Sequence, residues 1–222
     1  MNIPPTNCET GQLDPKICEL LDSCGISPLL INPIPIGRGG NHLVYSDLDR
    51  EWVVKVPINQ RIGTVGSAFE EEENINLYLH YFHGYSVPTT FLKSAQGYCA
   101  VMDYVDGCAP TSSDMTESIY GNDVLRQLKG IIEHNRRLML ETGKMIDLVG
   151  LEGLLYYFSG RLPLGMPARL TNLRICNDNL FIVDYDLVRF VDVYSPLDRV
   201  KSMFAYRLNV MMLKHYFNTD YE

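Results

Sequence analysis

The stretch IGRGGNHLVYSDLDREWVVKVP, residues 36–57, decides how the fold is interpreted. Two short runs rich in β-branched and aromatic residues, 43–45 and 52–56, flank a polar turn, and a glycine-rich turn precedes the first run. Such runs, bounded by turn residues, are typical of antiparallel strands. The stretch therefore predicts a hairpin that carries a glycine loop and one lysine, Lys55, inside an apolar strand.

The glycine loop and Lys55 each have an ordinary explanation beside a functional one. A glycine turn is more often only a turn, and a strand lysine commonly extends along apolar surface into water. Glycine also lets backbone N–H groups approach phosphate oxygens, because no Cβ intervenes. Adjacent strands of one hairpin would direct the loop and Lys55 toward the same ligand. The loop glycines are Gly37, Gly39 and Gly40.

Helical periodicity and strand-like runs alternate along the rest of the chain. Apolar residues at helical spacing, with capping residues at the segment ends, predict four helices. Helices mixed with antiparallel strands predict an α+β fold. The expected helices span 14–25, 67–82, 122–143 and 196–217, and the further strands lie within 88–105 and 173–193.

Four consecutive glutamates open the helix expected at 67–82. Most of them would be solvated there, where the helix dipole favours negative charge. One could turn inward and orient the ammonium group of Lys55. Glu72 is preferred, because it shares a helical face with the apolar residues three and seven positions later, and Glu71 and Glu73 are close alternatives.

An amide and a carboxylate flank a second predicted hairpin. Asn172 and Asp184 are 184 − 172 = 12 residues apart, with two strand-like runs between them. Asn and Asp beside a hairpin are usually turn residues. Their oxygens also suit Mg²⁺ that is held jointly with nucleotide phosphates, so the pair is a candidate metal site.

The order of these pieces resembles the signature set of the protein-kinase-like superfamily. The resemblance extends over roughly residues 34–190. The glycine loop matches with His42 in place of the third glycine, and the strand lysine matches in Val53-Val54-Lys55. Three further segments resemble the hinge (VMDYVDG, 101–107), the end of the catalytic loop (LTNL, 170–173) and the metal-binding Asp-Phe-Gly segment (IVDYD, 182–186).

This resemblance implies a two-lobed, protein-kinase-like fold with a truncated, mainly helical C-terminal lobe. The expected divisions are an N-terminal arm and helix (1–28), an N-terminal lobe with the sheet and one helix (29–105) and a reduced C-terminal lobe (106–222). Only 222 − 186 = 36 residues follow Asp186, and no Ala-Pro-Glu motif occurs. Regulation through a phosphorylated activation loop is therefore not expected.

The resemblance also implies ATP and Mg²⁺ as cofactors, bound between the two lobes. Lys55 would contact the α- and β-phosphates and pair with Glu72, while Asn172 and Asp184 would hold the metal. The residues implied for catalysis are Asp147, Lys55, Glu72 and Arg169, and those implied for binding ATP are Gly37, Gly39, Gly40, Val44, Lys55, Asp103 and Val105.

The catalytic aspartate departs from the family pattern. It should precede Asn172 by five residues, at 172 − 5 = 167, and Pro167 cannot accept a proton. Arg169 occupies the place of the family's catalytic-loop lysine, so the register agrees although the acid is missing. Asp147, just after the long helix, is the preferred replacement, and it requires an insertion over 148–171.

The function expected from the resemblance is transfer of phosphate to a Ser or Thr hydroxyl on a protein substrate. The alternatives are a pseudokinase that acts through partner contacts and a kinase for a small molecule. Nineteen Lys and Arg against 27 Asp and Glu give a net charge of −8, which argues against nucleic-acid binding.

Three further features bear on location and redox state. No apolar run reaches the roughly 18 residues of a membrane span, so no membrane partner is expected. The first residues lack a secretory pattern, so a cytoplasmic protein is expected, with a translocated effector as a weaker alternative. The six cysteines form no C-x-x-C pair and are expected to be reduced, although a disulfide among the first three stays open.

Overall fold

The computed structural model describes residues 15–26, 34–38, 42–57, 65–95, 97–111, 121–149, 169–189 and 196–217. The chain separates into two compact units, of which the first comprises Met1–Ile75 and Pro88–Tyr104 and the second comprises Asn76–Val87 and Val105–Glu222. The change of unit at 104 lies one residue from the boundary expected at 105. The membership of Asn76–Val87 in the second unit has no counterpart in the expected divisions.

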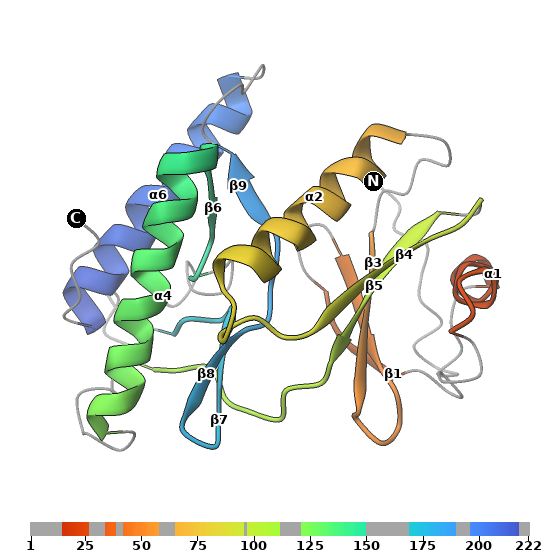
Figure 1. The fold of residues 1–222 in the computed structure, drawn as a ribbon, viewed down its shortest axis with the longest axis horizontal. Coiled ribbons are helices and arrows are strands. Elements are labelled where there is room, and N and C mark those ends of the chain that lie inside the picture. The colour runs from red at the N-terminus through yellow and green to blue at the C-terminus, as the bar shows by residue number, and fades with distance from the viewer. Residues whose placement is uncertain are drawn as a thin grey trace, which may run out of the picture. The chain divides into compact units, whose positions relative to one another are not determined.

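A five-stranded antiparallel sheet forms the first unit (Figure 1). The hairpin predicted over 36–57 is confirmed, since its two strands pair in register from His42 opposite Pro57 to Ser46 opposite Val53. In spatial order the strands are β1 (Ile34–Arg38), β2 (His42–Ser46), β3 (Trp52–Pro57), β5 (Tyr98–Asp103) and β4 (Thr89–Lys93).

The turn between β2 and β3 is held by one side chain. The carboxylate of Asp47 accepts hydrogen bonds from the backbone N–H groups of Glu51 and Trp52, at 2.8 and 3.0 Å. Arg50 adopts φ 55° within this turn, and its N–H donates to the Asp47 carbonyl. Asp therefore closes the turn by supplying acceptors that a strand partner would otherwise provide.

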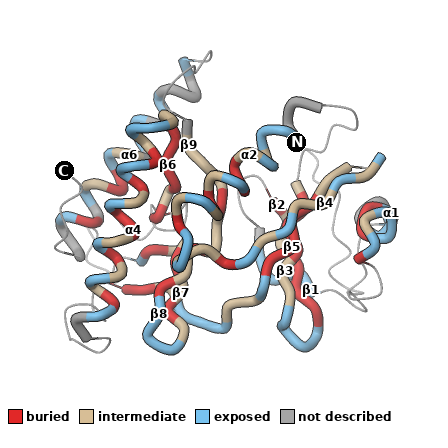
Figure 2. The backbone as a smooth tube through the Cα atoms, viewed as in Figure 1, coloured by how far each residue is buried: buried red, intermediate tan, exposed pale blue. Residues whose placement is uncertain are grey.

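One face of the sheet packs against α1 (Pro15–Ser23). Buried residues gather on the central strands β3 and β5 (Figure 2). Successive strand residues point to opposite faces, so the members of the cluster on β3 and β5 are alternate residues. The cluster contains Leu20, Leu21, Ile26, Tyr45, Val54, Val56, Cys99 and Val101. This face forms the hydrophobic core of the first unit, so the candidate residues have to be sought on the opposite face.

The helix α1 ends at Ser23, two residues before Gly25, the last residue of the helix expected over 14–25. Gly25 adopts φ 76°, a left-handed conformation that glycine reaches without a steric cost. Its N–H donates to the Asp22 carbonyl, and the Ile26 N–H donates to the Leu21 carbonyl, each at 2.9 Å. These two bonds satisfy carbonyls that the last helical turn leaves open.

Helices and two short strand pairs make up the described part of the second unit. The two long helices, α4 (Gly121–Thr142) and α6 (Pro196–Phe217), confirm the predictions at 122–143 and 196–217. The helix predicted at 67–82 is α2 (Val65–Tyr81), whose last turns belong to this unit. The strand pairs are β6 (Lys144–Ile146) with β9 (Leu187–Arg189) and β7 (Leu173–Cys176) with β8 (Asn179–Ile182).

The pair β7–β8 is the hairpin predicted between Asn172 and Asp184. Its turn consists of Asn177 and Asp178, at φ 50° and 62°, which are residue types that tolerate the left-handed region. The hairpin brings its two ends together, so Asn172 and Asp184 lie at the same edge. The apolar residues Leu173, Ile175, Leu180 and Ile182 are buried.

These elements confirm the α+β class. Among the helices in the described part of the chain, none combines the length and the hydropathy that a bilayer crossing requires. The cysteines at 18, 24, 99, 108 and 176, all in described segments, are in the thiol form, as expected. Burial, together with the neighbouring Cys24 thiol, raises the pKa of Cys99, which keeps that thiol protonated.

Candidate functional site

In the first unit, three of the residues predicted to bind ATP form a row across the sheet. Gly37 is opposite Val44, Val44 is opposite Lys55, and Lys55 is opposite Ala100. Residues directly opposite one another in a sheet point to the same face. The row lies on the face away from α1, because Val54 and Val56, the neighbours of Lys55, occupy the core face.

Lys55 is buried rather than extended into water. Only 6% of its surface is exposed, which excludes the ordinary explanation of a snorkelling strand lysine. A buried ammonium is costly unless polar or charged groups surround it. The burial therefore places a cationic group at a fixed position on the face that carries Gly37 and Val44.

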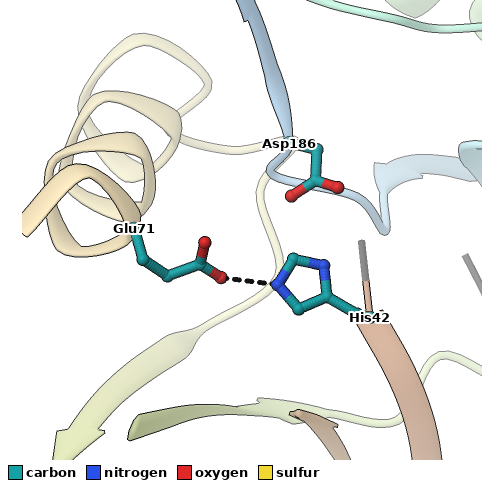
Figure 3. A group of neighbouring side chains, drawn as sticks. All are labelled: His42, Glu71 and Asp186. Carbon is teal, nitrogen blue, oxygen red and sulfur yellow. Dashed lines mark hydrogen bonds and ion pairs between the residues drawn. The ribbon is translucent and has the colours of Figure 1, made fainter. Parts of the chain in front are cut away.

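The acidic residue that α2 directs inward is Glu71. Its side chain points toward His42 (Figure 3), and its Oε1 lies 2.8 Å from Nε2 of His42. The side chains of Glu71 and His42 are 12% and 5% exposed. His42 lies at the start of β2, on the same face as Val44 two residues later. The His42 that replaces the third glycine of the loop thus has a specific partner on α2.

The preference for Glu72 needs correction. Glu72 is exposed to solvent, whereas Glu71 is half-buried and engages His42. Glu71 precedes the buried Ile75 and Tyr78 by four and seven residues, so it belongs to the inward face of the helix. Glu72 is turned about 100° from Glu71 around the helix axis and faces water.

In the second unit, Asp147 and Asn172 are in direct contact. The side-chain Nδ2 of Asn172 donates to the backbone carbonyl of Asp147 at 2.5 Å, across 25 residues of sequence. The preceding residue, Thr171, donates through its hydroxyl to the carbonyl of Val149 at 2.6 Å. The side chains of Thr171 and Asn172 therefore connect their segment to the segment that carries Asp147.

Asp184 adjoins the same cluster through the hairpin. The N–H of Val183 donates to the backbone carbonyl of Asn172 at 2.9 Å. The carboxylate of Asp184 accepts the N–H of Asp186 at 3.4 Å, which bends the chain after the strand. Asp147, Asn172 and Asp184 are all half-buried, so each residue remains partly exposed to solvent while hydrogen bonds hold the backbone at or next to it.

This arrangement brings together one carboxylate, one amide and a second carboxylate that sequence analysis assigned to one reaction. Asn172 and Asp184 offer hard oxygen atoms of the type that Mg²⁺ prefers. Asp147 offers a carboxylate beside them that could accept a proton. The Asn172 bond to the Asp147 carbonyl places the backbone of Asp147 next to Asn172.

The other predicted residues are placed as follows. Arg169 is exposed and forms an isolated backbone bridge with Thr111. Asp103, the last residue of β5, is exposed, and Val105 is half-buried in the second unit. Gly39, Gly40 and Pro167 lie outside the described residues, as do the N-terminal arm before residue 15 and most of the 148–171 insertion.

Three residues of this region gave no signal that the sequence analysis used. Asn135 in α4 and Asn209 in α6 are both fully buried and bond to the segment around Asp147. Tyr78 in α2 bonds to the backbone just before Asp184. A lone asparagine inside an otherwise apolar helix stretch, Leu208-Asn209-Val210, could have indicated Asn209. Asn135 lies between His134 and Arg136, so no such pattern marks it.

Tyr78 joins two backbone segments through its hydroxyl. The hydroxyl donates to the Ile182 carbonyl and accepts the N–H of Val87, each at 2.5 Å. Burial raises the pKa of Tyr78 above its ordinary value of 10.0, and the nearby Asp184 carboxylate adds to the shift. The phenol therefore stays neutral and keeps its proton for the bond to Ile182.

Replacing Tyr78 with Phe is expected to lower the free energy of unfolding by about 1–3 kcal/mol, because two buried backbone groups lose their partner. Urea denaturation at pH 7 measures this loss. Tyr81→Phe, the same change at an exposed bond to Glu141, is the control and should cost less than about 1 kcal/mol.

The same variant has a pH signature. Above pH 10 the unfolded chain ionises this tyrosine while the folded chain does not, so wild-type stability decreases as pH rises toward the raised pKa. Tyr78→Phe lacks this contribution. The difference in unfolding free energy between wild type and Tyr78→Phe should therefore shrink, by up to about 1.4 kcal/mol for each unit of rising pH. A deficit that stays constant from pH 9 to 11 would contradict the assigned protonation.

Comparison with known proteins adds no relative to this description. No protein-family model matches the chain, and no curated protein matches it.

Proposed function

We propose that the chain is an ATP-dependent phosphotransferase of the protein-kinase-like class, acting on a Ser or Thr hydroxyl of a protein. The observation that carries the proposal is the cluster of Asp147, Asn172 and Asp184 in the second unit, built by the Asn172 bond to the Asp147 carbonyl. These are the three residues that the order of motifs assigned to the acceptor and to the metal. The hairpin itself brings Asn172 and Asp184 together, and the contact with Asp147, 25 residues before Asn172, adds the third member.

The row Gly37–Val44–Lys55 in the first unit supports the same proposal. It aligns a glycine, an apolar residue and a buried cation on one sheet face. In the proposed reaction, Lys55 binds the α- and β-phosphates, Val44 contacts the adenine and Gly37 leaves room for phosphate oxygens. Glu71 replaces Glu72 as the acidic residue of α2 that acts on this face.

The proposed chemistry is in-line transfer of the γ-phosphoryl group. The acceptor oxygen forms a bond to phosphorus, the bond from phosphorus to the leaving oxygen of ADP breaks, and the hydroxyl proton passes to the carboxylate of Asp147. Mg²⁺, held through Asn172 and Asp184, would neutralise phosphate charge. Such a reaction depends mainly on positioning and electrostatics, which these few side chains can supply.

A binding experiment tests the metal assignment. ATP with Mg²⁺ at about 100 times its Kd should stabilise the wild type by about 2.7 kcal/mol, seen as a rise in melting temperature. In Asp184→Asn, the part of this rise that depends on Mg²⁺ should vanish. Asp178→Asn, which removes the same charge at the exposed hairpin turn, should behave as wild type.

An assay of phosphate transfer from labelled ATP distinguishes a protein kinase from a pseudokinase and from a small-molecule kinase. Label that passes from ATP to proteins of a cell lysate, and is lost in Lys55→Ala, supports the proposal. ATP-dependent stabilisation without transfer would favour a nucleotide-binding pseudokinase. Transfer to amino alcohols or aminoglycosides but not to proteins would favour a small-molecule kinase, and the absence of both binding and transfer would refute the proposal.

A further inference from the structure

The segment that carries Asp147 is held by two buried asparagines on different helices. Asn135 of α4 donates to the Ile146 carbonyl and accepts the Ile146 N–H, both at 2.8 Å. Asn209 of α6 accepts the Leu148 N–H at 2.9 Å. Both asparagines are 0% exposed. The residues on either side of Asp147 are thus fixed by side chains from elements that are remote in sequence.

Asn209 differs from Asn135 in one respect. Its Nδ2 donates to Oδ1 of the Asp147 carboxylate at 2.7 Å, whereas the bonds of Asn135 to Ile146 end on backbone atoms. Asparagine is suited to this position, because one side chain offers a donor and an acceptor side by side. Asn209 uses the acceptor for Leu148 and the donor for the adjacent carboxylate.

The carboxylate is therefore oriented from two sides. Oδ1 of Asp147 also accepts the N–H of Val149 at 3.1 Å. Two donors on one oxygen oppose rotation about the Cβ–Cγ bond, because a rotation that removes Oδ1 would leave the buried Asn209 amide without its acceptor. The direction of the second oxygen, Oδ2, is thereby set.

We propose that Asn209 is a positioning residue that fixes the Asp147 carboxylate so that its second oxygen receives the acceptor hydroxyl. This inference rests on the proposed phosphotransferase function and extends it to a helix that the motif pattern does not include. Asn209 itself touches neither substrate nor phosphate. Its contribution is the orientation of a group whose misplacement by about 1 Å can cost on the order of 10²-fold in rate.

Asn209→Asp is the decisive variant. It keeps the oxygen that accepts the Leu148 N–H and replaces the donor to Asp147 with a carboxylate oxygen, which repels the Asp147 carboxylate instead of orienting it. The variant therefore separates support of the backbone from orientation of the carboxylate. We expect kcat for phosphate transfer to fall on the order of 10–10²-fold, with KM for ATP unchanged. Asn209→Ser, which retains a donor on a shorter side chain, should recover part of this loss.

Asn135→Asp is the matched control, because it makes the same change in the other buried asparagine. It should lower the urea midpoint to a similar extent as Asn209→Asp while kcat stays within about 3-fold of wild type. Equal losses of kcat in the two variants would show that Asn209 acts only through stability. Unchanged kcat in Asn209→Asp would also refute the positioning role.

An NMR measurement tests the bond independently of activity. The side-chain amide protons of Asn209 should resonate downfield in the wild type and move upfield in Asp147→Ala. No change would refute the assigned bond, even in an active enzyme. A wild type without any transfer, but with this shift, would instead show that the proposed function is wrong while the Asn209–Asp147 contact is real.

Discussion

Phosphate transfer is expected to fall by roughly 10²–10⁴-fold when Asp147 is replaced with Asn, which is the usual contribution of a positioned general base. The amide cannot take the acceptor's proton. Its oxygen can still accept from Val149 and Asn209, so the fold should be preserved. A radiolabel assay with saturating Mg²⁺ and ATP measures the loss directly.

The controls separate a role in proton transfer from a role in metal binding. ATP-dependent stabilisation should be retained in Asp147→Asn, since Asn172 and Asp184 are intact. Asp178→Asn, at the hairpin turn, should transfer phosphate at the wild-type rate. If Asp147→Asn kept wild-type activity, the acid would have to come from another part of the chain, and the inserted-loop interpretation would fail.

Asn135→Ala is expected to cause the largest loss of stability, about 3–5 kcal/mol in the free energy of unfolding. The change strands the N–H and the carbonyl of Ile146 in a fully buried place, and each lost partner costs about 1–3 kcal/mol. A cavity of the size of the amide adds to the loss. Urea denaturation followed by circular dichroism measures it.

Asn179→Ala serves as the control for this prediction. Asn179 is exposed, and its side chain bonds only to the Asn177 carbonyl within the hairpin turn, at 3.0 Å. Its removal should change stability by less than about 0.5 kcal/mol. Similar losses in the two variants would mean that buried bonding does not explain the importance of Asn135.

The structure also explains why one interpretation of the glutamate run was wrong. Glu70 to Glu73 are chemically identical, so only their angular position distinguishes them. The apolar residues used to choose Glu72 were Ile75 and Leu79, of which Ile75 is buried and Leu79 is only half-buried. Asn74 is buried although it is polar, and Glu71 lies three residues before it on the same side of the helix.

Pattern and turn chemistry were enough for the local elements. The Gly25 helix stop, the hairpin over 36–57 and the hairpin between Asn172 and Asp184 each depend on residues close together in the chain. The hairpin pattern also indicated that Lys55 lies on a strand adjacent to the one that follows the glycine loop. The hairpin geometry alone places Asn172 near Asp184, since its strands return to their starting edge.

Interactions between distant residues were decided by the tertiary structure alone. Glu71 meets His42 across 29 residues, and Asn209 meets Asp147 across 62. Local periodicity shows which residues are buried but not which buried polar groups pair, because every unpaired donor or acceptor must find a partner wherever the packed chain supplies one. The sequence therefore determined the α+β elements and the candidate residues. Only the tertiary structure showed that Tyr78, Asn135 and Asn209, from α2, α4 and α6, hold the segments that carry Asp147 and Asp184.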